Sequence, residues 1–172
     1  MLIMSTPAIH PAALNAETLL ADCRVRFGRR SGPGGQHRNK VETAVVITHL
    51  PSGQIGSASE RRSQAENRKT ALARLRTNLA LAVRCPIREA PSKLWQSRCR
   101  GGRIQVNPAH DDFPALLAEA LDVLAAHDMN LRTAAEWLRC TPTQLTRFLK
   151  LEERALAQVN QRRKDLGLGP LR

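Results

Sequence analysis

The sequence predicts an α+β protein: a small β-sheet with one packed basic helix and an extended glycine-rich loop, followed by an α-helical C-terminal module with a helix-turn-helix-like hairpin. Two observations predict this arrangement. Three short strand-like runs lie within residues 22–58, and apolar residues recur at helical spacing after residue 112. We therefore divide the chain into a first domain at 1–85, a basic linker rich in Pro and Gly at 86–111, and a helical module with a basic tail at 112–172.

Three strands are expected in the first domain. Asp22–Phe27 alternates between apolar and polar residues, and Thr43–Leu50 is rich in β-branched residues. Pro51, Ser52 and Gly53 form a turn signal, so Gln54–Ala58 is expected to return as the third strand.

A basic helix follows the strands. Ser63 and Glu66 spell a capping box, which marks a helix start, and Pro86 stops the helix. Its apolar residues recur at helical spacing: Leu72, Leu75, Leu79 and Ala82. The basic residues lie outside that stripe: Arg61, Arg62, Arg68, Lys69, Arg74 and Arg76.

The last third is expected to be helical. One short strand, Arg103–Val106, is expected in the linker before it. Asp112, Asn130 and Thr141 are the expected N-caps of three successive helices. The first of these has an apolar stripe formed by Leu116, Leu117, Ala120, Leu121 and Leu124. Leu131–Leu149 resembles a helix-turn-helix, although any tight helical hairpin gives a similar pattern.

The charge of the chain favours a polyanionic partner. Lys and Arg number 27 against 15 Asp and Glu, a net charge of +12. Nucleic acid is the commonest partner of such a chain, with an anionic membrane surface second. No apolar run approaches the roughly 18 residues of a membrane span, so we expect no membrane partner. Because the chain has no Tyr, two Trp and three Phe, contacts to nucleic acid should depend on charge and shape rather than on base stacking.

Neither targeting nor metal binding is expected. Residues 1–16 carry no Arg or Lys, unlike a signal or transit peptide, so a cytoplasmic location is expected. A zinc site from Cys85, Cys99 and His110 is the alternative to free thiols, but zinc ligand pairs are normally closely spaced. We therefore expect no metal and four free thiols, Cys23, Cys85, Cys99 and Cys140.

The loop between the first two strands carries a glycine-rich tip, Ser31-Gly32-Pro33-Gly34-Gly35-Gln36-His37. Glycines allow unusual backbone angles and a close approach by another molecule. A plain glycine turn is one interpretation. A phosphate-binding P-loop fits poorly, because G-x-x-x-x-G-K-[ST] is absent.

The residues around this tip strongly resemble the catalytic domain of bacterial and organellar peptide chain release factors over roughly residues 20–84. The shared positions are Gly34–His37, Asn39, Lys40, Ile47–His49, Pro51, Gly53, Arg62–Gln64 and Asn67. Arg38 departs from the family, which usually has an apolar residue there. The resemblance implies an enzyme that hydrolyses the peptidyl-tRNA ester, with Gly34, Gly35 and Gln36 as catalytic residues.

The resemblance assigns the Gln36 backbone N–H to the developing oxyanion, where one donor is worth roughly 2.7–4 kcal/mol in other acyl-transfer sites. Acid-base catalysis by His37 or His49 is less expected than packing or RNA contact. The expected RNA contacts are Arg29, Arg30, Ser31, His37, Arg38, Asn39, Lys40, Arg61, Arg62, Asn67, Arg68 and Lys69. A second set of contacts is expected from Arg147, Lys150, Arg162, Arg163 and Lys164. The implied partners are large-subunit ribosomal RNA and peptidyl-tRNA, with no cofactor and a monomeric protein.

Nothing in the sequence resembles a stop-codon tripeptide region, apart from a Thr141-Pro142-Thr143 string in the helical part. The chain is therefore similar to the codon-independent rescue branch, akin to alternative rescue factor B. It departs from that branch in having a predicted helical bundle before its basic end. Two alternatives stay open: a helix-turn-helix DNA-binding regulator, and a non-catalytic RNA-binding factor associated with the ribosome.

Overall fold

The structure of the chain, a computed structural model, describes residues 9–28 and 43–172. The first half contains η1 (Pro11–Ala13), α1 (Ala16–Ala21), β1 (Cys23–Gly28), β2 (Ala44–His49), β3 (Ile55–Ala58) and α2 (Gln64–Ala82). The second half contains α3 (Lys93–Arg98), β4 (Cys99–Arg100), β5 (Arg103–Ile104), α4 (Phe113–Ala126), α5 (Leu131–Trp137), α6 (Pro142–Leu149) and α7 (Glu153–Asp165). The predicted α+β class is confirmed.

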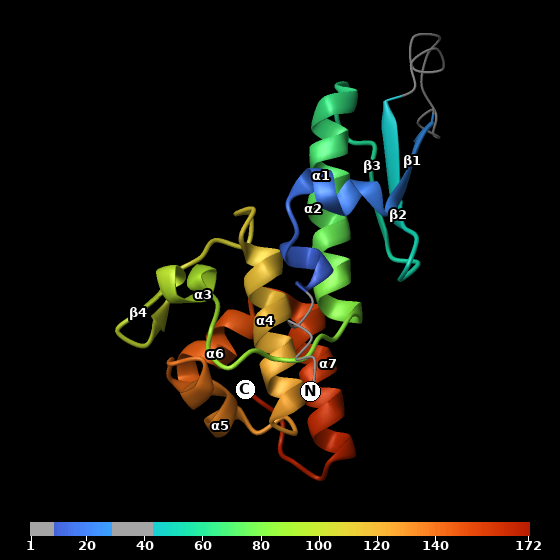
Figure 1. Ribbon diagram of the computed structural model, residues 1–172. Coiled ribbons are helices and arrows are strands. Elements are labelled where there is room, and N and C mark those ends of the chain that lie inside the picture. The colour runs from blue at the N-terminus through green and yellow to red at the C-terminus, as the bar shows by residue number, and fades with distance from the viewer. Residues whose placement is uncertain (1–8, 29–42) are drawn as a thin grey trace, which may run out of the picture.

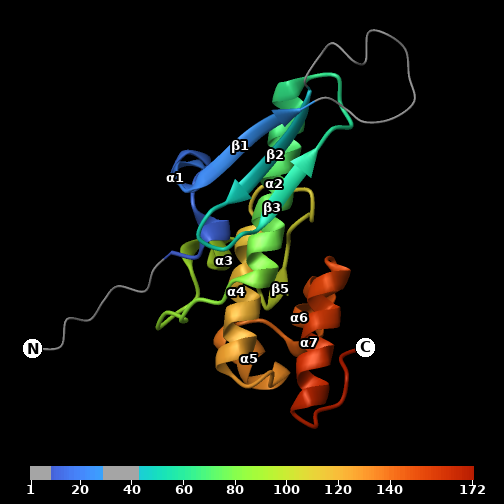
Figure 2. The ribbon, with the colours of Figure 1, turned by 90° about the vertical axis from the view of Figure 1, so that its right-hand side faces the viewer.

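The first three strands form an antiparallel sheet in the order β1-β2-β3. Each begins one residue later than the sequence predicts, which is within the usual scatter of strand ends. Along β2, Val45 and Ile47 are fully buried while their neighbours are only partly buried, so one face of the sheet contributes to the core. Figure 2 shows α2 lying along this face, with the strands crossing in front of it.

Helix α2 begins as predicted, since the Ser63 side chain accepts a hydrogen bond from the Glu66 N–H at 3.3 Å. Its buried stripe includes Leu75 and Leu79. Ala82 was expected in the stripe but is exposed, and Leu81 is buried instead. The reason is that this end of α2 extends past the sheet and packs against α4 (Figure 1).

The buried apolar residues of both halves form one contiguous core. Figure 1 shows the layers: the sheet, then α2, then α4, with α3, α5 and α6 beyond α4. All five residues of the stripe predicted for α4 are buried: Leu116, Leu117, Ala120, Leu121 and Leu124. Because α4 packs against α2 and α2 packs against the sheet, the two halves of the chain share this core.

The segment 86–111 contains more structure than the single strand that the sequence predicts. Helix α3 precedes a two-stranded hairpin of β4 and β5, and β5 ends at Ile104 rather than Val106. Trp95 of α3 is only 1% exposed, its Nε1–H donates to the Leu138 carbonyl at 2.8 Å, and its ring meets Phe148 edge-on. A six-residue helix gives little periodic signal, and burial of one large side chain stabilises it instead.

The three residues predicted as helix caps in the second half all occupy N-cap positions, and two of them make the side-chain cap hydrogen bond. The Asn130 side chain accepts from the N–H groups of Arg132 and Thr133, and Thr141 accepts from Gln144. Asp112 occupies the predicted N-cap position of α4, but its side chain makes no cap hydrogen bond and instead pairs with Arg98 at 2.6 Å. Within the described residues, no helix combines the length and apolar character required to cross a membrane.

Candidate functional site

The predicted catalytic residues Gly34, Gly35 and Gln36 lie outside the described residues, as do Arg29, Arg30, Ser31, His37, Arg38, Asn39 and Lys40. The described structure supplies the two strands from which this segment departs and to which it returns. Gly28, the last residue of β1, is paired with Ala44, the first residue of β2. Segment 29–42 therefore joins two paired strands at one end of the sheet.

Asn67 fixes the start of α2 to the residue that precedes β2. Its side-chain Nδ2–H groups donate to the carbonyls of Thr43 at 2.7 Å and Arg61 at 2.9 Å, and its Oδ1 accepts from the Arg61 N–H at 2.9 Å. Asn67 is 0% exposed, so the expected RNA contact by this residue is corrected. Its amide is used inside the protein, where it satisfies three backbone groups.

The other basic residues predicted around the start of α2 are on the surface. We call the set Arg61, Arg62, Arg68 and Lys69 the α2 basic face, and all four side chains are exposed. Arg61 flanks the Asn67 hydrogen bonds, which places this face near the point where segment 29–42 enters β2. Further along α2, Arg74 donates to Glu60 at 2.6 Å, and this hydrogen bond holds the pKa of Glu60 below its usual value. The α2 basic face thus presents cations near the start of β2, the strand that follows the predicted catalytic segment.

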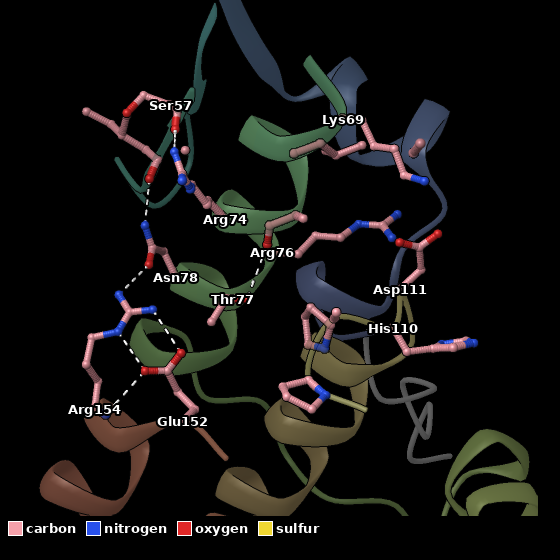
Figure 3. Close-up of a pocket in the computed structure, with 18 residues that line it drawn as sticks. Ser57, Lys69, Arg74, Arg76, Thr77, Asn78, His110, Asp111, Glu152 and Arg154 are labelled. Carbon is pink, nitrogen blue, oxygen red and sulfur yellow. Dashed lines mark hydrogen bonds and ion pairs between the residues drawn. The ribbon is translucent and has the colours of Figure 1, made fainter. Parts of the chain in front are cut away.

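A hollow of about 600 Å³ crosses the solvent side of α2 and reaches β3, the loop before α4 and the start of α7. Figure 3 shows Arg74, Asn78, Glu152 and Arg154 along one side of it. Asn78 donates to the Ile55 carbonyl at 2.7 Å and accepts from Arg154 at 2.8 Å. These bonds join the sheet, α2 and α7.

Neither Asn78 nor Arg154 is predicted from the sequence, because no local pattern links residues 76 positions apart. Across the hollow, Figure 3 places Lys69, Arg76, His110 and Asp111. Arg76 donates to the Leu14 carbonyl at 2.6 Å, while its buried Nε finds no acceptor among the described residues. The hollow is thus lined by cations and anions together, and the hydrogen bonds of Asn78, Arg154 and Arg76 hold elements of the fold together.

The predicted second set of RNA contacts divides into two kinds. Arg147 and Lys150 of the α6 region, and Arg162 and Lys164 of α7, are exposed. Arg163 instead donates to the carbonyls of Gly169 at 2.7 Å and Met129 at 2.5 Å, and so fastens the C-terminal residues to the turn after α4. Arg163 therefore has a structural role that its place in a basic run does not reveal.

The described histidine of the motif is a packing residue. His49 is 4% exposed, and its Nδ1 lies 2.7 Å from the Ser52 hydroxyl in the turn between β2 and β3. It is paired with Cys23, at the end of the sheet opposite to Gly28 and Ala44. This position agrees with the structural interpretation of His49 rather than with acid-base chemistry at segment 29–42.

Cys85, Cys99 and His110, the alternative zinc site, do not come together as possible metal ligands. Among the described residues, only His10, Cys85 and Asp122 have ligand atoms that all lie within 4.8 Å of one another. His10 Nδ1 accepts from the Ala12 N–H, and its Nε2 lies 3.2 Å from the Val83 carbonyl. Asp122 accepts from Arg84 and from the Cys85 N–H.

Burial dominates the electrostatics of this cluster. It lowers the pKa of His10 and raises the pKa of Asp122 to about 6 and that of the Cys85 thiol above its usual value. A protonated thiol and a neighbouring arginine both disfavour a cation. We therefore interpret the cluster as a buried hydrogen-bond network, and all four cysteines of the chain are unpaired.

Comparison with known proteins identifies the first half. The RF-1 domain family matches residues 14–106, more than half of the 172 residues. The match takes in the sheet, α2, α3 and the β4–β5 hairpin. Peptide chain release factor 1 of Acidiphilium cryptum (strain JF-5) is 47% identical over 76 residues, 43% of this chain. The chain spans only 22% of the length of that relative. On the extent of the RF-1 match, the chain belongs to the peptide chain release factor family.

Proposed function

We propose that this chain hydrolyses the ester of peptidyl-tRNA in the ribosomal peptidyl-transferase centre without reading a stop codon, and so releases peptides from stalled or split ribosomes. The observation that carries the proposal is the Gly34-Gly35-Gln36 sequence on the connection between β1 and β2 of an RF-1 domain. Release is also the activity named for the 47% identical relative.

The proposed chemistry requires little from side chains. Attack of water on the ester carbonyl builds negative charge on oxygen, and the Gln36 backbone N–H is the proposed donor to that oxygen. Gly34 and Gly35 have no side chains, which lets the backbone enter a confined RNA cavity. The Gln36 amide is neutral and cannot act as a general base near pH 7, so its proposed role is to position water and exclude larger nucleophiles.

RNA binding is proposed for the α2 basic face and for the basic residues of segment 29–42. Exposed cations near the start of β2 suit a target surrounded by phosphates, because arginine and lysine bind phosphate oxygens through charge-assisted hydrogen bonds. A second contact is proposed for the exposed residues of the helical half, Arg147, Lys150, Arg162 and Lys164. Asn67 and Arg163 are left out, because both are committed to internal hydrogen bonds.

Codon independence is proposed by similarity to the alternative rescue factor B branch. The one string that resembles a codon-reading tripeptide, Thr141-Pro142-Thr143, serves as a helix start: Thr141 caps α6 and Pro142 occupies its first turn. Its composition is therefore accounted for by local structure. We further propose that the protein acts as a monomer in the cytoplasm.

The test is peptide release from ribosomes loaded with labelled peptidyl-tRNA. Three substrates are compared: ribosomes stalled at the end of a truncated mRNA, ribosomes paused at a sense codon, and isolated large subunits. The proposal expects release from the first or the third without any stop codon. Release only when a stop codon occupies the decoding site would contradict it.

A further inference from the structure

The β4–β5 hairpin places two arginines directly opposite each other. Gly101 and Gly102 form its turn with φ of +56° and +74°, and Arg100 is paired with Arg103 across the ladder. Side chains in such a pair begin about 4.5–5.5 Å apart, and like charges at that spacing destabilise a hairpin. Both arginines are exposed, and neither has an acidic partner among the described residues. The hairpin thus carries an uncompensated repulsion.

Arg139 is a second locally unfavourable residue. It follows α5 with φ of +56°, and the Arg139 and Cys140 N–H groups bond back to the carbonyls of Glu136 and Ala135. This is the Schellman arrangement, in which the residue with positive φ is usually glycine. Met129 also has positive φ, but its side chain packs against the core. The Arg139 side chain is exposed and makes no such internal contact in the described structure.

The fold brings these residues to one corner. The Thr141 N–H donates to the Gly102 carbonyl at 3.3 Å, and the Cys99 thiol donates to the Arg139 carbonyl at 3.6 Å. These contacts join the hairpin to the turn between α5 and α6. We call Arg100, Arg103 and Arg139 the arginine corner. Figure 1 shows the hairpin beside α3 and α6, at the far side of the molecule from the strand ends that lead into segment 29–42.

We propose that the arginine corner binds the phosphate backbone of a structured RNA and so forms a further anchor, remote from the strand ends that lead into segment 29–42. Three exposed cations gather here, although like charges opposite each other in a hairpin and a positive φ at an arginine are both unfavourable. A polyanion is the partner that stabilises such a cluster. Structured RNA is favoured over stacked single strands because no aromatic residue belongs to the corner. The choice of RNA over DNA rests on the proposed action on ribosomes.

The sharpest test is Arg139→Gly, because it predicts opposite changes in stability and binding. Glycine suits a positive φ, so the melting temperature should rise by about 2–4 °C. Binding of fluorescein-labelled transfer RNA should weaken, and the slope of log K against log salt concentration should fall by about one. Arg132→Gln is the matched control, since Arg132 is exposed at the other end of α5 and should leave affinity within about twofold.

Arg100→Thr/Arg103→Thr removes the cross-strand repulsion and should reduce the salt slope by about two, with stability kept or raised. Equal losses for Arg132→Gln and Arg139→Gly would overturn the proposal, because they would indicate a general charge effect. Unchanged transfer RNA binding together with lost binding to a DNA duplex or to phosphatidylserine vesicles would also overturn it. Binding is measured without peptide release, so failure of the release assay alone would reject the proposed hydrolysis and not the RNA contact.

Discussion

The side-chain amide of Asn67 donates a 2.7 Å hydrogen bond to the carbonyl oxygen of Thr43. This bond joins the first turn of α2 to the residue at which the chain re-enters the sheet after segment 29–42. The same amide satisfies two backbone groups of Arg61. The α2 basic face and the return of the predicted catalytic segment are therefore held by one buried side chain.

Asn67→Ala should destabilise the fold by about 2–3 kcal/mol, because it removes a fully buried side chain that satisfies three backbone groups. Urea unfolding followed by circular dichroism measures the change. Arg68→Ala is the control, since Arg68 is exposed and its loss should alter stability by less than about 0.5 kcal/mol. Equal stability of the two variants would contradict the assigned role of Asn67.

Gly56→Ala should be among the most damaging changes in the sheet. A Cβ built at Gly56 lies 2.1 Å from the Ala71 carbonyl oxygen and 2.5 Å from the Leu75 nitrogen, both in the backbone of α2. Strand β3 would have to move away from the helix, at a cost of about 3 kcal/mol or more. Gly28→Ala is the matched control, because no described residue lies within 4 Å of a Cβ built there and stability should change little. Thermal unfolding of both variants makes the comparison.

Asp122→Asn should remove part of the pH dependence of stability. Burial raises the pKa of Asp122 to about 6, above its value of 3.8 in an unfolded chain. The folded state therefore binds the proton more tightly, and the contribution of Asp122 to stability falls as pH rises from about 4 to about 6.

Urea unfolding across that range should show the wild type losing stability relative to Asp122→Asn, with a constant difference above about pH 7. An opposite slope would mean that the ion pair with Arg84 outweighs burial of the carboxylate.

Trp95→Phe tests whether the segment between the two halves is part of the core. The change removes the donor to the Leu138 carbonyl and loosens the edge contact with Phe148, so about 1–3 kcal/mol should be lost. Trp137→Phe is the control, since that side chain is only partly buried. Chemical unfolding followed by circular dichroism gives both values. A larger loss for Trp137→Phe would contradict the structure.

The sequence predicted elements where short-range patterns are strong. β-Branched residues located β2, and the side chains of Ser63, Asn130 and Thr141 located three helix starts because a cap acts within three residues. Asp112 precedes α4 as predicted, but its carboxylate pairs with Arg98, a partner that no local rule identifies. Helix α3 was missed because the burial of Trp95 depends on α5 and α6.

The candidate site shows the same division. The Gly34-Gly35-Gln36 tip was predicted from the resemblance of its flanking residues to release factors, and the cations of the α2 basic face were predicted to lie outside the apolar stripe from helical periodicity. Asn67 belongs to the same motif, but the motif does not say whether a polar residue within it faces RNA or the interior. Only the positions of Thr43 and Arg61 decide this. Arg154 and Arg139 belong to no motif. A long-range hydrogen bond identifies Arg154, and a positive φ identifies Arg139.

Peptide release by Gly35→Ala tests the central proposal most directly. An added methyl group restricts the backbone beside Gln36 and enlarges a tip that must enter a confined cavity. The account predicts that release from ribosomes carrying labelled peptidyl-tRNA falls by about 100-fold or more while ribosome binding stays within about twofold. Release at the wild-type rate by Gly35→Ala, with binding intact, would contradict it.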